Sequence, residues 1–271
     1  MKETPMNKDP HNLAGLLFEA YASRKKLPVF SRRLNLSTED AYAVQASFVK
    51  QVEAYTKKSS LGYKIGGCSY KGEKGKFGFH YGQLVPANLY ANNSSIGIPE
   101  EEEICAEAEI GLYLNERIHS VFCPDDVFMA IDAVVPVLEL TRTRFSGDRT
   151  LSDTICDNAA HLAVVTGSAL PCLPDPDLEF SPIITINSSY PEYRRGSASI
   201  RMMADYILLL KDELQKRSTL IRPGCLFLSG TLSRPSLKLR PDDSVMADFG
   251  NSLIVSAHFQ CLYSHSISDK I

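Results

Sequence analysis

The chain has 271 residues, of which 44% are hydrophobic and 23% are charged. These proportions are typical of a globular protein that is long enough to bury a sizeable core. The formal net charge of −3 gives no bulk electrostatic attraction to nucleic acid or to anionic membranes. The polar start lacks a signal peptide, and no apolar run approaches the ~20 residues that span a bilayer. We therefore expect a cytoplasmic protein with no nucleic-acid and no membrane partner.

Two amphipathic helices are predicted in the first sixty residues. In the first, apolar side chains recur at helical spacing; they are Leu13, Leu16, Leu17, Ala20 and Tyr21. The second begins with a capping box formed by Ser37 and Asp40, and its apolar positions are Val44, Phe48, Val52 and Tyr55. A loop containing Pro28 joins the two. We interpret residues 1–58 as an N-terminal helical cap and residues 59–271 as the catalytic core.

The sequence after Ser60 is predicted to be mixed and rich in strands. Short β-rich runs bounded by turn residues support this prediction; they are IGLYL at 110–114, CLFLSG at 225–230 and SLIVSAHF at 252–259. Helical spacing indicates two further helices, at about residues 125–134 and 204–216. Residues 70–78, YKGEKGKFG, have little apolar content and are predicted to form a mobile loop or lid.

Two glutamates point to a metal site in the run CAEAEIGLYL at residues 105–114. Ile110, Leu112 and Leu114 alternate along one face of a predicted strand. Glu107 and Glu109 then share the other face, about 7 Å apart, where both carboxylates reach one ion. On a helix the same spacing would make the two side chains diverge.

A third acid, Glu139, lies inside the apolar run VVPVLEL. A buried charge there needs a partner, and two explanations compete. One is a salt bridge to Arg142 or Arg144 just downstream; the other is a metal. Three converging carboxylates without a histidine favour Mg²⁺ or Mn²⁺ over zinc. The acidic run at residues 101–103 is instead interpreted as a solvated turn.

Taken together, the residues resemble the 2-oxo-4-pentenoate hydratases and 4-oxalocrotonate decarboxylases of the fumarylacetoacetate hydrolase superfamily. The resemblance is carried by short motifs in a characteristic order: AYAVQ at 41–45, GYKIG at 62–66, FG at 77–78, EAEI at 107–110, VPVLE at 135–139, DNA at 157–159 and LSG at 228–230. It implies an α+β fold with a fumarylacetoacetate-hydrolase-like mixed β-roll core. It also implies a Mg²⁺ or Mn²⁺ ion held by Glu107, Glu109 and Glu139, and it makes Lys64 the active-site lysine.

The sequence departs from the family pattern at three places. Lys76 stands where an acidic residue usually precedes Phe-Gly, Ala160 stands where a serine usually follows Asp-Asn-Ala, and a Gly-His-Pro segment is absent near residues 200–202. The proton-transfer group is therefore sought elsewhere, in a metal-bound water, His80 or Lys64, with a polar lid residue as the alternative interpretation of His80. His161, in contrast, is interpreted as a core histidine.

Substrate contacts are expected from three further side chains. Arg144 is a candidate for a second carboxylate, unless a nearby acid pairs with it. Ser229 and Thr231 are candidates for hydrogen bonds to the substrate, with tight-turn packing as the alternative. The expected activity is hydration of a 2-hydroxy-2,4-dienoate to a 4-hydroxy-2-oxo acid, a step in aromatic catabolism. The alternatives are a 4-oxalocrotonate-type decarboxylase and a degenerate, non-catalytic homologue that binds a small acid. By resemblance we also expect a homo-oligomer.

Overall fold

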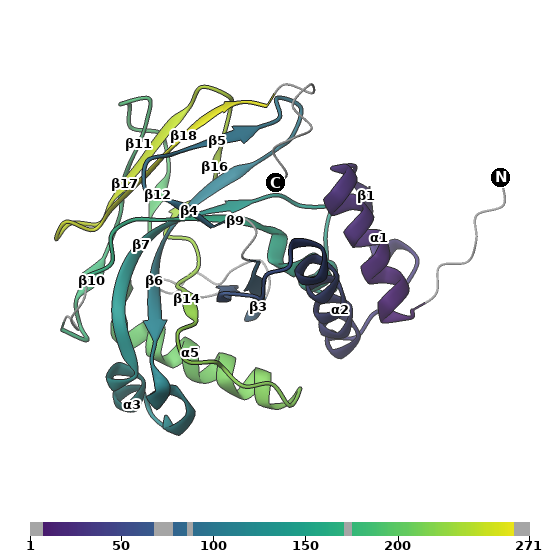
Figure 1. Ribbon diagram of the computed structural model, residues 1–271, viewed down its shortest axis with the longest axis horizontal. Coiled ribbons are helices and arrows are strands. Elements are labelled where there is room, and N and C mark those ends of the chain that lie inside the picture. Colours follow the sequence, from purple (N-terminus) through teal and green to yellow (C-terminus); the bar gives the residue numbers. More distant parts are fainter. Residues whose placement is uncertain (1–7, 68–77, 86–88, 171–174, 263–271) are drawn as a thin grey trace.

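The computed structural model describes residues 8–67, 78–85, 89–170 and 175–262 (Figure 1). Its α-helices are α1 (Pro10–Ser23), α2 (Thr38–Thr56), α3 (Pro124–Met129), α4 (Leu151–Cys156) and α5 (Ile200–Gln215). Its longer strands are β2 (Gly62–Gly66), β3 (His80–Leu84), β4 (Leu89–Ala91), β5 (Ser94–Ile98), β6 (Cys105–Leu114), β7 (Ile131–Thr141), β9 (His161–Thr166), β11 (Ile183–Ile186), β14 (Leu226–Leu228), β17 (Ser244–Asp248) and β18 (Ile254–Cys261).

Seven further strands contain two residues each: β1 (Leu27–Pro28), β8 (Phe145–Ser146), β10 (Glu179–Phe180), β12 (Arg194–Arg195), β13 (Ala198–Ser199), β15 (Ser233–Arg234) and β16 (Leu237–Lys238). Six of them form separate two-stranded sheets, β1 with β8, β10 with β13 and β12 with β15, and β16 pairs with β6 of the large sheet.

An eight-stranded sheet forms the centre of the molecule. Its strand order is β3-β2-β14-β6-β7-β9-β4, and β16 adds to β6. The long antiparallel pair β6–β7 places Glu107 directly opposite Glu139. A second, four-stranded sheet has the order β11-β17-β18-β5. In Figure 1 the second sheet lies across the upper part of the first, while α3 and α5 lie at the opposite end.

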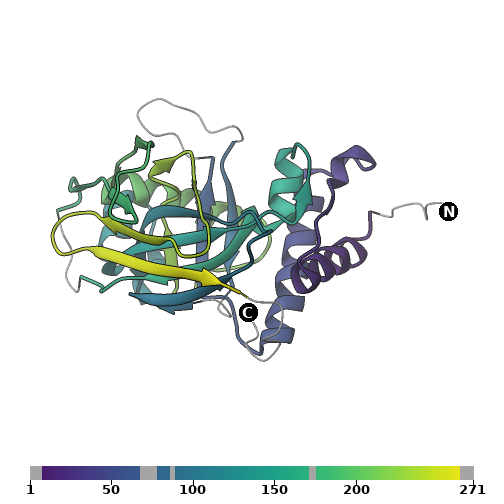
Figure 2. The ribbon, with the colours of Figure 1, turned by 90° about the horizontal axis from the view of Figure 1, so that it is seen from above.

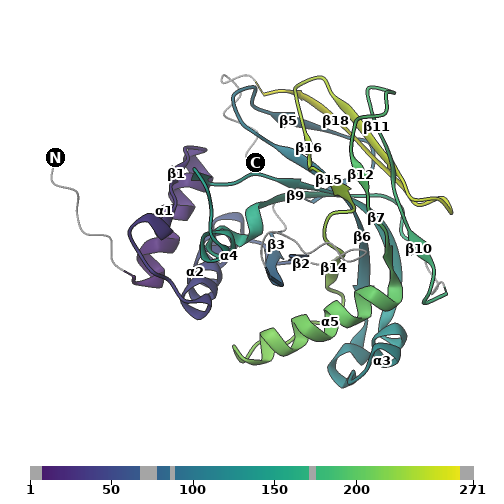
Figure 3. The same cartoon turned by 180° about the vertical axis from the view of Figure 1, so that it is seen from behind.

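The N-terminal helices lie on one side of the two sheets, as Figure 2 shows from above. α1 packs on α2, and α2 packs on α4 (Figure 3). The buried faces of the helices, including Leu17 and Phe48, belong to the same hydrophobic cluster as Ile65 and Phe145 of the core. The helical cap is thus continuous with the core in packing, and the division after residue 58 stays a prediction.

The capping box of α2 is confirmed, because Ser37 and Asp40 exchange side-chain to backbone hydrogen bonds. Both predicted later helices have different bounds. α3 ends at Met129, and residues 131–134 belong to β7, where Ile131 and Val134 pair with β6. The prediction of a helix to residue 134 was therefore wrong: pairing with β6 determines the conformation of this β-branched segment.

The second of these helices, α5, begins at Ile200, earlier than predicted, because Ser199 caps it by accepting from the backbone N–H of Met202. The predicted loop at residues 70–78 lies outside the described residues except for Gly78. Within the described ranges, no helix is both long enough and apolar enough to cross a membrane.

Candidate metal centre

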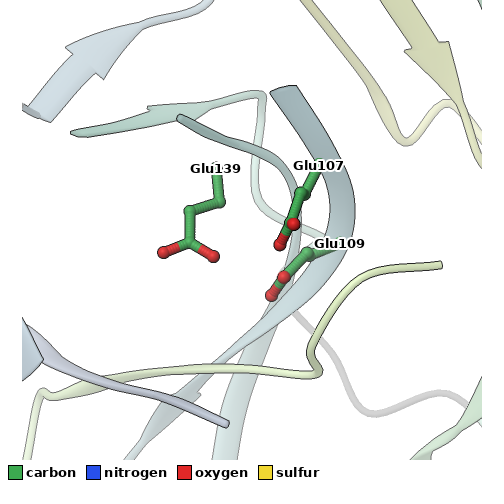
Figure 4. Close-up of side chains that lie close together, drawn as sticks. All are labelled: Glu107, Glu109 and Glu139. Atoms are coloured by element: carbon green, nitrogen blue, oxygen red, sulfur yellow. The ribbon is translucent and has the colours of Figure 1, made fainter. Parts of the chain in front are cut away.

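Three glutamates converge on one point of the large sheet. Glu107 and Glu109 extend from the same face of β6, and Glu139 extends from β7 (Figure 4). One carboxylate oxygen from each lies within 4.8 Å of the others. Glu109 and Glu139 have no solvent exposure, whereas Glu107 is partly exposed. The predicted sharing of one strand face by Glu107 and Glu109 is confirmed, and strand register adds Glu139 to the cluster.

Lys64 of β2 is the cation of this cluster. Its Nζ lies 2.6 Å from Glu139 Oε2 and 3.9 Å from Glu107 Oε2. It also donates to the backbone oxygen of Ala159 at 3.4 Å. Burial alone would lower the pKa of Lys64, but the three carboxylates more than offset it and raise the pKa above its usual value. The lysine is therefore a buried, protonated ammonium.

The charges of the cluster do not balance. Three carboxylates face one ammonium, and burial followed by repulsion from Glu139 raises the pKa of Glu109 well above its ordinary value. Burial also raises the pKa of Glu107. Oε1 of Glu109 is buried and has no hydrogen-bond partner among the described residues. An all-oxygen donor set with surplus negative charge and an unsatisfied carboxylate oxygen fits a hard divalent cation such as Mg²⁺ or Mn²⁺.

Neighbouring groups fix the orientation of each carboxylate. Gly230 donates its backbone N–H to Glu109 Oε2 at 3.0 Å, and Ser236 donates its hydroxyl to Glu107. His161 Nδ1 lies 2.8 Å from Glu139 Oε1. Burial would raise the pKa of Glu139, but Lys64 and His161 together hold it below its ordinary value.

His161 was interpreted from sequence as a core histidine. It is completely buried in the structure, yet its ring contacts a candidate metal ligand. Burial lowers its pKa, so the ring is neutral and Nδ1–H donates to the carboxylate. A histidine that orients a ligating carboxylate is common around metal sites. Its contact with Glu139 depends on β7–β9 pairing, in which His161 is the register partner of Thr141, two residues along β7, and no local sequence pattern reveals this pairing.

A cavity of about 440 Å³ opens beside the cluster, within the usual size range of small-molecule sites. Lys64, His80 and Glu107 line it, together with Thr231 and Ala160. Three arginines also line it: Arg142 after β7, Arg149 between β8 and α4, and Arg234 of β15. The carboxylate cluster is therefore accessible to a small polar ligand.

His80 is the first residue of β3, and only 6% of its surface is exposed. The lid interpretation of His80 was therefore wrong. Its Nδ1 lies 2.9 Å from the backbone oxygen of Gly78, which can only accept, so Nδ1 carries the proton in the neutral ring. Burial lowers the pKa of His80, and the nearby positive charge of Lys64 lowers it further. The ring packs on Gly66, where a Cβ would lie 2.4 Å from Nε2.

A left-handed turn, Asn158–Ala160, forms one wall of the cavity. Three consecutive non-glycine residues adopt φ values of 52°, 52° and 60°, a conformation that costs roughly 1 kcal/mol or more per residue. The side chain of Asn158 accepts from the backbone N–H of Gln83 at 2.7 Å and donates to its oxygen at 2.8 Å. These bonds hold the turn so that Ala159 presents its carbonyl to Lys64.

Two of the predicted substrate contacts do not reach the cavity. Arg144 is buried and pairs with Asp157 at 2.9 Å, which is the alternative that the sequence left open. Ser229 is completely buried, and its hydroxyl accepts from the backbone N–H of Ile110. Thr231 does line the cavity, although its hydroxyl donates to the backbone oxygen of Ser233.

Glu139 does form an ion pair, but its partner is Lys64. The prediction that a downstream arginine pairs with Glu139 was therefore wrong. Arg142 pairs with Glu102 at 2.6 Å instead. The acidic run is a turn, as predicted, with Glu102 half-buried against that arginine. Of the departures from the family pattern, Ala160 lines the cavity, whereas Lys76 lies outside the described residues.

Comparison with known proteins identifies the fold. The sequence matches no protein-family model and no curated protein sequence. The structure is similar to 4-oxalocrotonate decarboxylase from Pseudomonas putida G7 in complex with magnesium and adipate. The TM-score is 0.80 at 19% identity, covering 95% of this chain and 100% of that chain.

The same decarboxylase in complex with calcium and acetate gives a TM-score of 0.79 at 20% identity, with 95% and 100% of the two chains covered. A yeast protein of the fumarylacetoacetate hydrolase family gives a TM-score of 0.53 at 16% identity, covering 76% of this chain and 95% of that chain. The solved structures thus confirm the predicted architecture: the chain has the mixed α/β fold of the fumarylacetoacetate hydrolase superfamily.

Proposed function

We propose that the protein is a divalent-metal-dependent enzyme that adds water to a 2-hydroxy-2,4-dienoate and releases a 4-hydroxy-2-oxo acid. The observation that carries the proposal is the buried cluster of three carboxylates and one lysine beside an open cavity. Glu107, Glu109 and Glu139 would hold Mg²⁺ or Mn²⁺. When bound, such an ion supplies a Lewis acid that polarises the oxygens of a 2-oxo acid.

Lys64 provides a fixed positive charge next to this site. Its ammonium is held by Glu139 and by the Ala159 carbonyl, and it lines the cavity. A preorganised cation in a buried position stabilises negative charge that develops on the substrate's 2-oxygen. Because its pKa is raised, Lys64 acts as an electrostatic partner rather than as a base at neutral pH.

His80 is the proposed base. In its neutral ring Nδ1–H donates to Gly78, so Nε2 is the nitrogen that accepts a proton. It would take the proton of the water whose oxygen adds to the double bond. The lowered pKa of His80 keeps this ring neutral at pH 7.

The test is loss of 2-hydroxypenta-2,4-dienoate absorbance on adding the protein with Mg²⁺ or Mn²⁺. We expect metal-dependent turnover that EDTA abolishes. Glu107→Gln should remove this turnover while leaving the circular dichroism spectrum unchanged. Absence of turnover with either metal would contradict the hydratase proposal.

A second candidate is decarboxylation of a 4-oxalocrotonate-type substrate. The likeness to the Pseudomonas decarboxylase supports it, because that likeness extends over nearly the whole length of both chains. Release of CO₂ from 2-oxo-3-hexenedioate distinguishes this reaction from hydration. Both reactions use the same carboxylates and Lys64, so Glu107→Gln serves as the control for each.

A non-catalytic homologue that binds a small acid is the third candidate, motivated by Ala160 in the cavity wall. It predicts Mg²⁺-dependent binding of a 2-oxo acid with no turnover of either substrate. The expected homo-oligomer, and the cytoplasm as the place of action, stay predictions; light scattering of the purified protein measures the first of them.

A further inference from the structure

A second cavity, of about 440 Å³, lies where the helical cap meets the core, and we call it the junction cavity. Its wall is built by four segments that are far apart in the sequence: the end of α1 with the loop after it, the turn before β6, the loop after β7, and β16. The glutamates of the acidic turn at residues 101–103 line it, and so do six cationic side chains: Arg24, Lys25, Lys26, Arg142, Arg144 and Lys238. The three glutamates of the metal centre and Lys64 do not line it, so the junction cavity is a separate site.

Two glutamates of the junction cavity are each shared by two cations. Glu102 lies 2.6 Å from Arg142 and 3.7 Å from Arg24. Glu103 is shared in the same way by two of the lysines, at 3.4 and 3.9 Å. One carboxylate neutralises only one of its two cations, so each of these groups leaves one positive charge over.

The remaining charges of the junction cavity balance. Arg144 pairs with Asp157, which lies outside the cavity, at 2.9 Å. Lys25 and Glu101 are both exposed and carry opposite charges. Of the six cations, Arg144 is thus offset by Asp157 and three others by the three glutamates, which leaves two positive charges. Arg142 is only 7% exposed, and a cation removed from water is stabilised by a nearby anion.

One short strand pair brings these cations together. α1 ends at Ser23, and Arg24 caps it in the left-handed conformation, with φ of 61°. The chain then enters β1, where Leu27 pairs with Phe145 of β8 and donates its backbone N–H to the oxygen of Arg144 at 2.9 Å. The basic residues 24–26 are thereby held next to the loop after β7.

We propose that the junction cavity binds a dianionic phosphate group, either free or as a phosphate ester. A phosphate group carries about two negative charges near neutral pH, which equals the surplus of the cavity. Its oxygens accept hydrogen bonds from several directions, and the cations here approach from the end of α1, the loop after β7 and β16. A carboxylate is planar and has a single charge, so it matches this arrangement less well.

The junction cavity shares a wall with the cavity beside the metal centre, because Glu103, Arg142 and Thr143 line both. A phosphate site is therefore located by residues that line only one of the two. Arg24 and Lys26 line only the junction cavity. Substitution of both leaves Glu102 with Arg142 and Glu103 with Lys238, and it removes the two surplus charges.

The test is calorimetric titration of the metal-free protein, kept in EDTA, with inorganic phosphate, phenyl phosphate and nitrate. At least one of the phosphates should bind at least about tenfold more tightly than nitrate, which has a single charge. The tighter of the two phosphates shows whether the cavity takes free phosphate or an ester. Arg24→Gln/Lys26→Gln should weaken this binding by at least about tenfold, because charge-assisted hydrogen bonds are lost.

Lys57→Gln/Lys58→Gln is the matched control, since it also removes two exposed charges, and Lys57 is the left-handed C-cap of α2 as Arg24 is of α1. This variant should leave phosphate affinity unchanged. Arg149→Gln should do so as well, because Arg149 lines only the cavity beside the metal centre.

Three results would overturn the proposal: neither phosphate binds more tightly than nitrate, the two double variants lose affinity equally, or the loss is confined to Arg149→Gln. The last result would place the phosphate beside the metal centre. Because no divalent metal is present in the titration, each of these outcomes leaves the proposed function standing.

Discussion

The molecule buries two pairs of opposite charges near the candidate metal centre, Arg144 with Asp157 and Lys64 with Glu139. Both pairs are almost inaccessible to solvent, and both lie on or next to the large sheet. They differ in the groups around them. The first pair is surrounded by its own hydrogen bonds, whereas the second shares its ammonium with two further carboxylates.

The Arg144–Asp157 pair is balanced in charge. Asp157 accepts from the Thr143 hydroxyl at 2.9 Å and from the backbone N–H of Arg144 at 3.1 Å, in addition to the ion pair. The Arg144 guanidinium donates to the backbone oxygen of His161 at 2.8 Å and lies 4.9 Å from the centroid of the Phe48 ring. Such a pair fastens the helical cap to the loop after β7.

The Lys64–Glu139 pair is not balanced. Glu107 and Glu109 add negative charge that the ammonium cannot offset alone, and an oxygen of Glu109 has no partner among the described residues. Buried surplus charge costs stability unless an ion compensates for it. The ratio of carboxylates to cations therefore distinguishes a structural ion pair from a site prepared for a metal.

The largest expected effect is on the balanced pair. Asp157→Asn keeps the shape of the side chain but leaves the Arg144 charge buried without a counter-ion. We expect the free energy of unfolding to fall by about 3 kcal/mol, the usual cost of breaking a buried pair. Urea denaturation followed by circular dichroism measures this loss. A change below about 0.5 kcal/mol, typical of surface substitutions, would remove the distinction between the two pairs.

The corresponding substitution beside the Lys64–Glu139 pair should have the opposite effect on unfolding stability. Glu109→Gln removes a buried charge, and its amide oxygen still accepts from Gly230. Without metal we expect unfolding stability to stay the same or to rise. Mg²⁺ affinity should fall by more than about 100-fold. This exceeds the loss that is typical when a residue that only hydrogen-bonds to a metal ligand is replaced. Calorimetry measures the affinity, and the stabilisation by Mg²⁺ seen in the wild type should disappear.

His161 connects the two pairs, since its ring contacts Glu139 and its backbone oxygen accepts from Arg144. His161→Leu removes the donor that orients the carboxylate, so Mg²⁺ affinity should fall by about 10- to 100-fold. His161→Asn places an amide near the position of Nδ1 and should restore much of the affinity. Equal affinities of the leucine and asparagine variants would show that the hydrogen bond to Glu139 has no effect on the metal.

The smallest expected effect is a shift in pH dependence. Burial lowers the pKa of His80, so the neutral ring persists below the ordinary histidine value of about 6.5. Activity that needs this neutral ring should be constant near pH 7 and fall only when the pH drops through the lowered pKa. Imidazole NMR measures that pKa directly, with the signal assigned by its loss in His80→Gln. A pKa above 6.5 would contradict the buried, neutral state.

Much of the metal site could be predicted from local pattern. Alternation of residues along β6 correctly placed Glu107 and Glu109 on one face. The partner of Glu139 could not be predicted, because Lys64 is 75 positions earlier in the sequence and reaches it through the order β2-β14-β6-β7. Nearby arginines were the natural local candidates, yet each pairs with another acid.

Helix bounds were less predictable than helix existence. The spacing of apolar residues was sufficient to predict that α1 and α2 exist, because each helix packs one face on the core. At residues 131–134 the same spacing was misleading, since Ile131 and Val134 are buried three positions apart, as on a helix, although both belong to strand β7. The positions of His80 and of the turn at Asn158–Ala160 could not be predicted either, because only strand pairing brings them to the cavity.

The side chain of Asn158 has a consequence beyond the cavity wall. β3 is the edge strand of the large sheet, and edge strands offer unpaired backbone groups to strands of other chains. By bonding to both the N–H and the oxygen of Gln83, Asn158 occupies this edge as a neighbouring strand would. The turn that positions Lys64 therefore also protects the sheet against intermolecular strand addition, so damage to it would reduce solubility as well as activity.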